Sequence, residues 1–465
     1  MSLKKLWIAL LTLLALGATV PAPVWAVGGA TAEVDQTLGL EALRQETGLT
    51  GAGVTVGIVG EGIANWQSLV PSGDLPSDIQ SVDGDEGNGL SLAHLQVIHD
   101  VAPGARLVFC ENDGIDIPAL LDLGAQIILF MDTAPYTTIF EDRLSEEARD
   151  VANSGVLVVA PAGDYGAGHY RATFTDSGNG EHDFGGGVTR LAVQVPAGCF
   201  AHAAVDWADP LSAPSYSDYR MHIYDSIDDP TYIDVDAGSY PMAAGFIGQY
   251  DQPWTFYLAA GKLPEAAVLP FDVRVQCDYP GPAGGLSTTL EPAYRVEKGS
   301  IIGVGALAEV LTVGALDDTT VVARQGLYAT RSYSGRGPAE ITIPGTEIRP
   351  KPDLMAPDCQ SQYVYTGESY VQCGTSVSAA VVAGIAALIQ EKRAFTRTRD
   401  IKELLTGTAA DLGEGGFDST TGWGQVDARA AIELPPVPAV DAAHVLLACL
   451  TAVALAISSI GRTRA

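Results

Sequence analysis

Four short and almost uninterrupted apolar runs dominate the first third of the sequence. They are Val54–Val59, Leu107–Cys110, Ile127–Met131 and Val156–Ala160. Helical patterns lie between them, at Ser91–His99 and Leu144–Asn153. Strands that are apolar throughout, rather than alternating with polar residues, are typical of a parallel sheet covered by helices on both faces. The sequence therefore predicts an α/β fold with a doubly wound, mostly parallel sheet.

The pattern changes at about residue 166. From there to residue 300, apolar and polar residues alternate in runs such as Leu191–Val195 and Phe271–Cys277, with glycines and prolines between the runs. This alternation is typical of antiparallel strands with one buried face. We therefore predict an inserted β-sandwich-like domain at residues 166–300, and an α/β domain made of residues 27–165 and 301–433.

Composition excludes one class of partner. The 465-residue chain has 26 basic and 56 acidic side chains, a net charge of −30. Such a charge repels phosphate backbones, so we expect no nucleic-acid partner. An apolar content of 47% with only 18% charged residues indicates a folded rather than a disordered chain.

Both ends of the chain carry targeting patterns. Lys4 and Lys5 precede an apolar run, and small residues end at Ala26, which predicts a secretory signal peptide at residues 1–26. Near the other end, a proline-rich linker at 434–441 precedes an apolar segment at 442–460 and a basic tail at 461–465. This layout resembles bacterial C-terminal sorting signals and predicts a transmembrane or sorting segment, with a buried C-terminal helix as the alternative. We expect an exported protein that is either anchored in the cell envelope or secreted.

Five cysteines precede the C-terminal segment, and an odd number cannot pair completely. In an oxidising compartment we predict the pairs Cys199–Cys277 and Cys359–Cys373, with Cys110 buried at a strand end as an ordinary hydrophobic residue. The chain has no CxxC or HExxH spacing, so the sequence gives no support for a zinc site.

The strongest local signal for chemistry is Gly374-Thr375-Ser376, at the start of a helical pattern rich in small residues that runs to Gln390. A serine in the first turn of a buried helix has its hydroxyl near the positive end of the helix dipole. Developing negative charge is stabilised there, which suits a nucleophile. A serine that only caps the helix is the structural alternative.

Other motifs accompany this serine in a fixed order. They are Gly53–Val59, Val101–Ala105, Val158–Asp164, Ser334–Pro338, Lys351–Pro357 and Gly422–Ala428. Together with the helix motif they resemble the subtilisin-like and sedolisin-like serine peptidases, over most of residues 39–433 outside the insert. The resemblance implies a serine endopeptidase that acts on protein or peptide substrates through an acyl-enzyme on Ser376. It implies no required cofactor. Many members bind structural calcium, for which acidic loops at 83–86 and 225–236 offer oxygen ligands.

The same resemblance places Asp164 at the oxyanion position. Subtilisins have an asparagine there, and sedolisins have an aspartate. An ionised carboxylate would repel the negative oxygen of a tetrahedral intermediate, so Asp164 can help only when it is protonated and donates a hydrogen bond.

The sequence departs from the family pattern at the other two triad positions. Gly60 stands where subtilisins have their aspartate, with Glu61 one residue further on. Leu90 stands where subtilisins have their histidine and sedolisins a glutamate, and His94 follows one helical turn later. We predict His94 as the general base, with Glu61 as its orienting acid.

Several alternatives remain open at this point. Glu61 or Glu86 could serve as a carboxylate base, as in sedolisins, and His169 is a further candidate. His94 could also be a core histidine without a catalytic role. Because two triad positions depart from the family, the alternative function is a catalytically impaired pseudopeptidase whose fold and β insert serve binding at the cell surface.

Overall fold

The computed structural model describes residues 28–82, 87, 89–112, 117–131, 143–209, 219–236, 241–278, 288–322, 327–342, 346–363, 369–395, 397–413 and 415–434. The predicted signal peptide and the predicted C-terminal segment both lie outside these residues. The chain divides into two compact units, Met1–Ala431 and Ile432–Ala465, and every element except the end of the last helix lies in the first. Among the described residues, no helix has both the length and the apolar character needed to cross a membrane.

A central sheet organises the α/β part of the chain. Its strand order is β16-β15-β5-β4-β1-β3-β2, and β19 pairs with β15. All of its strand pairs are parallel except β15 with β16. The strands are β1 (Thr55–Gly60), β2 (Gln80–Ser81), β3 (Arg106–Glu111), β4 (Ile127–Phe130), β5 (Leu157–Pro161), β15 (Leu311–Val322), β16 (Leu327–Thr330) and β19 (Leu354–Pro357). The predicted mostly parallel α/β sheet is confirmed: its central strands β4 and β5 are buried throughout, and β1 is buried beyond its first residue, as their apolar sequences require.

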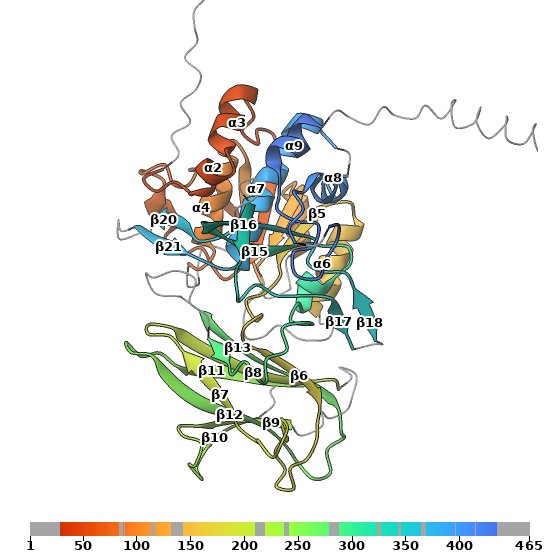
Figure 1. The fold of residues 1–465 in the computed structure, drawn as a ribbon. Helices are drawn as coiled ribbons and strands as arrows, with labels where there is room; N and C mark the ends of the chain where they lie inside the picture. Colours follow the sequence, from red (N-terminus) through yellow and green to blue (C-terminus); the bar gives the residue numbers. More distant parts are fainter. Residues whose placement is uncertain are drawn as a thin grey trace, which may run out of the picture. The chain divides into compact units, whose positions relative to one another are not determined.

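Figure 1 shows helices around this sheet. They are α2 (Val34–Thr37), α3 (Leu40–Thr47), α4 (Leu92–Val101), α5 (Ile117–Asp122), α6 (Arg143–Asn153), α7 (Thr375–Arg393), α8 (Asp400–Thr408) and α9 (Ala428–Glu433), with short 3₁₀ helices η1 (Trp66–Leu69) and η2 (Gly303–Ala306). One of them, α7, is buried along most of its length. Helix α7 packs against α4 and five strands of the sheet. A Cβ atom at Gly384 would lie 2.7 Å from the Cβ of Val101, so the small residues of α7 allow α4 to approach closely.

The insert contains two antiparallel sheets that share one apolar core (Figure 1). One has the order β10-β9-β12-β7-β14 and the other β11-β8-β13-β6. Their strands are β6 (His169–Thr173), β7 (Leu191–Val195), β8 (Phe200–Trp207), β9 (Tyr219–Tyr224), β10 (Ile233–Asp236), β11 (Met242–Gly248), β12 (Trp254–Lys262), β13 (Pro270–Asp278) and β14 (Thr289–Leu290). Two further hairpins belong to the α/β part: β17 (Ala339–Ile341) with β18 (Glu347–Arg349), and β20 (Gln360–Tyr363) with β21 (Ser369–Gln372).

Both predicted disulfides are present. Cys199 and Cys277 join β13 to the residue just before β8, and Cys359 and Cys373 close the β20–β21 hairpin. Cys110 is buried in β3 and belongs to neither disulfide, as predicted.

Candidate active site

The proposed nucleophile lies in the first turn of α7. Ser376 is the second residue of the helix and is half-buried, whereas Thr375 and Val377 on either side are buried. Gly374 precedes the helix with φ +134°, a backbone conformation that side-chain-bearing residues rarely adopt. A Cβ atom at Gly374 would lie 2.9 Å from Oδ2 of Asp164 and 3.5 Å from Oγ of Ser376. The structure therefore brings Ser376 and Asp164 together across Gly374.

Asp164 is tied directly to the first turn of α7. It follows β5, and its Oδ1 atom accepts hydrogen bonds from the backbone N–H and the hydroxyl of Thr375, each at 2.9 Å. The Thr375 hydroxyl oxygen in turn accepts the N–H of Gly163 at 3.1 Å. Since two donors already hold Oδ1, the Oδ2 atom is the one that faces Gly374 and Ser376.

A buried acid on the other side of Gly374 was missed by the sequence analysis. Asp358 follows β19, is fully buried, and its Oδ2 lies 3.4 Å from the backbone nitrogen of Gly374. Its carboxylate also accepts hydrogen bonds from the hydroxyl of Tyr333 and from Nε of Arg331, the latter at 2.8 Å. Burial raises the pKa of Asp358, and it also raises the pKa of Tyr333, to which the charges of Asp358 and Asp164 add. No sequence motif singles out Asp358, because its partners lie 16 to 27 positions away.

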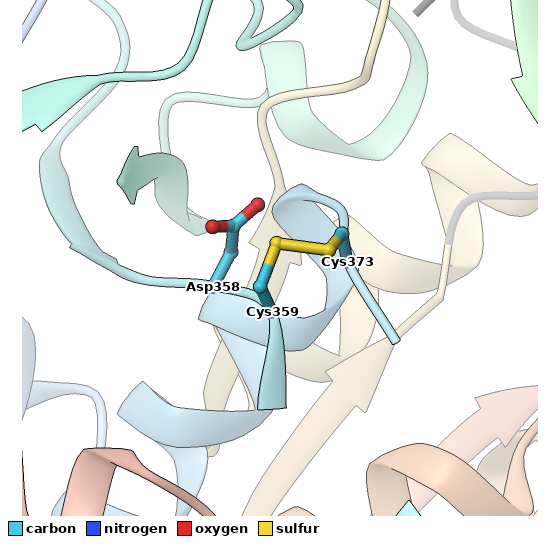
Figure 2. A group of neighbouring side chains, drawn as sticks. All are labelled: Asp358, Cys359 and Cys373. Carbon is cyan, nitrogen blue, oxygen red and sulfur yellow. A yellow bond between two sulfur atoms is a disulfide. The ribbon is translucent and has the colours of Figure 1, made fainter. Parts of the chain in front are cut away.

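Asp358 also belongs to a group of possible metal ligands, shown in Figure 2. Donor atoms of Asp358, Cys359 and Cys373 all lie within 4.8 Å of one another. The two sulfur atoms are bonded to each other, however, and a disulfide lacks the thiolate charge that binds metals. Of the two loops predicted as calcium ligands, residues 83–86 lie outside the described residues, and calcium binding stays a prediction.

The structure places His94 in the interior. It lies on α4 and only 2% of it is exposed. Burial lowers its pKa to about 4, although the backbone of Leu90 raises the pKa by a smaller amount. The Ser376 hydroxyl forms no hydrogen bond with His94 or with any other residue that the structure describes. The predicted contact between base and nucleophile is thus absent from this conformation.

The position of the family's aspartate has no room for a side chain. A Cβ atom at Gly60, the last residue of β1, would collide with Oγ of Ser91 and lie 3.0 Å from Sδ of Met131. Glu61 follows and is half-buried. The side chains that fill this space come from the N-cap of α4 and from the residue after β4, which no motif at Gly60 could reveal.

Glu86 and His169 are the remaining candidates for a catalytic base. Glu86 lies outside the described residues, but its neighbour Gly87 packs beside Gly62, where a Cβ atom at 87 would lie 2.8 Å from the Gly62 Cα. His169 is fully buried in the insert. Its Nδ1 contacts the carbonyl oxygen of Val296 at 2.5 Å and its Nε2 contacts Asp272 at 2.9 Å. Both nitrogens of His169 are therefore engaged within the insert.

One family of known proteins matches part of the chain. Residues 273–424, which include Asp358, Gly374 and Ser376, match the Subtilase family. This part of the chain therefore resembles the subtilases. Serine protease AprX of Bacillus subtilis is 32% identical over 121 residues, which are 23% of this chain and 26% of AprX. An extracellular serine protease of Serratia marcescens is 39% identical over 62 residues, which are 13% of this chain and 6% of that protein. The chain thus spans about a quarter or less of the curated relatives it matches.

Solved structures show loose likeness over a larger part of the chain. The CspB protease of Clostridium perfringens has a TM-score of 0.48 at 14% identity, and the alignment covers 86% of this chain and 98% of CspB. MycP1 from Mycobacterium smegmatis has a TM-score of 0.41 at 18% identity, with 90% and 88% covered. At these TM-scores the likeness is too loose to transfer a function to this chain.

Proposed function

We propose that the protein is an exported serine endopeptidase that hydrolyses peptide bonds through an acyl-enzyme on Ser376. The observation that carries this proposal is the placement of a half-exposed serine in the first turn of α7, with Asp164 directly across Gly374. The match of residues 273–424 to the Subtilase family supports the same reaction.

In the proposed reaction, Oγ of Ser376 attacks the carbonyl carbon of a peptide bond and loses its proton to a base. The carbonyl oxygen becomes an oxyanion beside Asp164 and the N-terminus of α7. Because the Thr375 donors hold Oδ1, the proton of a neutral Asp164 resides on Oδ2 and is donated to the oxyanion. Collapse of the intermediate breaks the C–N bond, the amine leaves with the proton, and water then hydrolyses the ester on Ser376.

For the base we retain His94, oriented by Glu61. A histidine with a pKa of about 4 is neutral in mild acid, so His94 can accept a proton there. The His94 ring would have to approach Ser376 when substrate binds, as catalytic hydrogen bonds often tighten only in the complex. Glu61 and Glu86 remain the carboxylate alternatives.

The proposal of export rests on the signal-like pattern at residues 1–26 and on the two disulfides, which form and persist in oxidising compartments. One of the relatives is itself described as extracellular. N-terminal sequencing of the protein recovered from outside the cytoplasm should begin after Ala26; a chain that retains Met1 and stays in the cytoplasm would contradict export.

Turnover of an unfolded protein substrate between about pH 3 and 9 tests the proposed peptidase, since this range spans the carboxyl and imidazole pKa values. We expect cleavage by the wild type and none by Ser376→Ala. The matched control is Ser378→Ala, which alters a fully buried serine two residues along the same helix and should preserve cleavage. Equal cleavage by Ser376→Ala and the wild type would contradict the proposal.

A second candidate is the pseudopeptidase, with the insert as its binding domain. Two observations favour it: the crowding at Gly60 leaves no space for the family's aspartate, and Ser376 has no hydrogen-bonded base among the described residues. Cleavage at any pH that depends on Ser376 would eliminate this candidate.

A further inference from the structure

Two links that are adjacent in the sequence join the end of β19 to the start of α7. Asp358 lies 3.4 Å from the backbone nitrogen of Gly374 and accepts its N–H. The next residue, Cys359, is disulfide-bonded to Cys373, which directly precedes Gly374. Figure 2 shows the Asp358 carboxylate beside this disulfide. Residues 358 and 359 therefore hold residues 373 and 374, two positions before Ser376.

Asp358 is itself fixed in place. Arg331 donates to its Oδ1 at 2.8 Å, and the Tyr333 hydroxyl donates to its Oδ2. Asp358 is fully buried and Tyr333 is nearly so. A buried carboxylate held on both oxygens, by the buried Tyr333 and the partly buried Arg331, is restrained from following Gly374 if the turn moves.

The segment between the two links is attached to other parts of the chain. In the β20–β21 hairpin, Tyr363 exchanges hydrogen bonds with Gln96 of α4, and the N–H of Ser361 donates to Glu33 at 2.6 Å. These contacts link α4 and the N-terminal segment to β20, which pairs with β21. Movement of α4 or of the N-terminal segment would therefore be passed to β21. The disulfide at the base of the hairpin keeps such movement from reaching Gly374.

We propose that the Cys359–Cys373 disulfide and Asp358 position Ser376, and that reduction of this one disulfide makes Ser376 unreactive. The inference rests on the proposed function, in which Ser376 is the nucleophile. Gly374 holds its unusual φ angle between two anchors, Asp358 on one side and the Asp164–Thr375 pair on the other. A displacement of about 1 Å at a catalytic group can lower a rate by about 100-fold.

The environment of the sulfurs suits reduction by a dithiol. Nη2 of Arg331 lies 3.1 Å from Sγ of Cys359, and a neighbouring cation stabilises a thiolate. Attack by the dithiol on Sγ of Cys373 would therefore release Cys359 as a thiolate beside Arg331. The second thiol of the dithiol then attacks the mixed disulfide. Cys373 leaves as a thiolate that takes up a proton, and the dithiol becomes a cyclic disulfide. Cys359 and Cys373 are 8% and 7% exposed; in the other disulfide Cys199 is 1% exposed and Cys277 is partly buried, so the cation beside Cys359 rather than exposure distinguishes the two bonds.

The test follows labelling of the full chain by a fluorophosphonate while dithiothreitol reduces the disulfides. Alkylation and mass spectrometry report which disulfide is open, and circular dichroism reports whether the protein remains folded. We expect the labelling rate to fall about 100-fold in step with opening of Cys359–Cys373, and to recover on reoxidation. Labelling of C359S/C373S should be equally slow, whereas C199S/C277S, which lacks only the disulfide of the insert, should label like the wild type.

Hydrogen exchange at the Gly374 amide gives a second measurement that needs no reactive serine. We expect faster exchange in the reduced protein and in C359S/C373S. Unchanged labelling of the folded, reduced protein overturns the inference, and so does unchanged exchange. If the oxidised protein never labels, the proposed function fails, and Gly374 exchange alone decides whether the disulfide holds this turn. If C359S/C373S does not fold, reversible reduction of the wild type supplies the same comparison.

Discussion

Asp164 and Thr375 are 211 positions apart in the sequence and are joined by two hydrogen bonds of 2.9 Å, both to Oδ1 of the carboxyl group. Thr375 directly precedes Ser376, so the loop after β5 and the first turn of α7 behave as one unit. Thr375, the residue directly before Ser376, therefore orients the Asp164 carboxyl group.

Asp164→Asn should make activity independent of the protonation of residue 164. The asparagine oxygen can accept both Thr375 bonds, and its amide would donate from the place of Oδ2 at any pH. An oxyanion donor contributes about 10² to 10³ in kcat. We therefore expect kcat of Asp164→Asn to exceed that of the wild type by up to about 100-fold at pH 8, with little difference at pH 4.

Asp164→Leu is the control for that experiment, because it removes both the Thr375 contacts and the donor. It should be poorly active across the pH range. If Asp164→Asn loses activity equally at pH 4 and pH 8, the proposed role of a protonated Asp164 is wrong.

His94 should make the folded protein less stable in acid. Its pKa falls from 6.5 to about 4 on folding, because burial disfavours the charged ring. Between these two pH values the unfolded chain binds more protons than the folded protein, so stability falls as pH falls, by about 3 kcal/mol in total. Urea unfolding at pH 7 and pH 4.5 should show a smaller loss for His94→Leu than for the wild type, by about 2 kcal/mol.

His94→Leu also tests whether His94 acts as the catalytic base. If His94 is the base, His94→Leu loses cleavage even at pH 7, where the folded state should remain stable. An identical pH dependence of stability in the two proteins would show that the buried, neutral His94 has been described wrongly.

Gly60→Ala should destabilise the protein, and Ser91→Ala should reduce that destabilisation. The added Cβ would collide with Oγ of Ser91, and overpacking of this kind costs about 1 to 3 kcal/mol. In a Ser91→Ala background the oxygen is gone, so the same substitution should cost about 1 kcal/mol less. Equal costs of Gly60→Ala in both backgrounds, measured by urea unfolding, would argue against the crowding.

Much of the frame could be predicted from the sequence because it depends on local patterns. Continuous apolar strands are typical of a parallel sheet covered by helices. The small residues of α7 indicate a helix that packs closely against its neighbours. The glycine, threonine and serine at its start are contiguous, so Ser376 could be found by inspection. Asp164 could be assigned to the oxyanion position through the resemblance of Val158–Asp164 to the serine peptidases.

The rest of the site depends on contacts between distant segments. Gly60 is crowded by Ser91, which belongs to the next helix, and nothing near Gly60 reveals this. Asp358 is brought to Gly374 by the path of a hairpin, and its partner Arg331 directly follows β16. His94 lies on α4, whose residues are all buried. Its position on the helix therefore could not show whether its ring contacts Ser376. The acceptor of the Ser376 proton therefore stays a prediction.

The most direct measurement is the position and stoichiometry of a covalent adduct after exposure of the oxidised protein to a fluorophosphonate. The proposed function predicts one phosphonyl group per chain, located on Ser376 by peptide mass spectrometry and absent from Ser376→Ala. A folded, oxidised protein that takes up no phosphonyl group between about pH 3 and 9, or takes it up at another residue, would contradict the account.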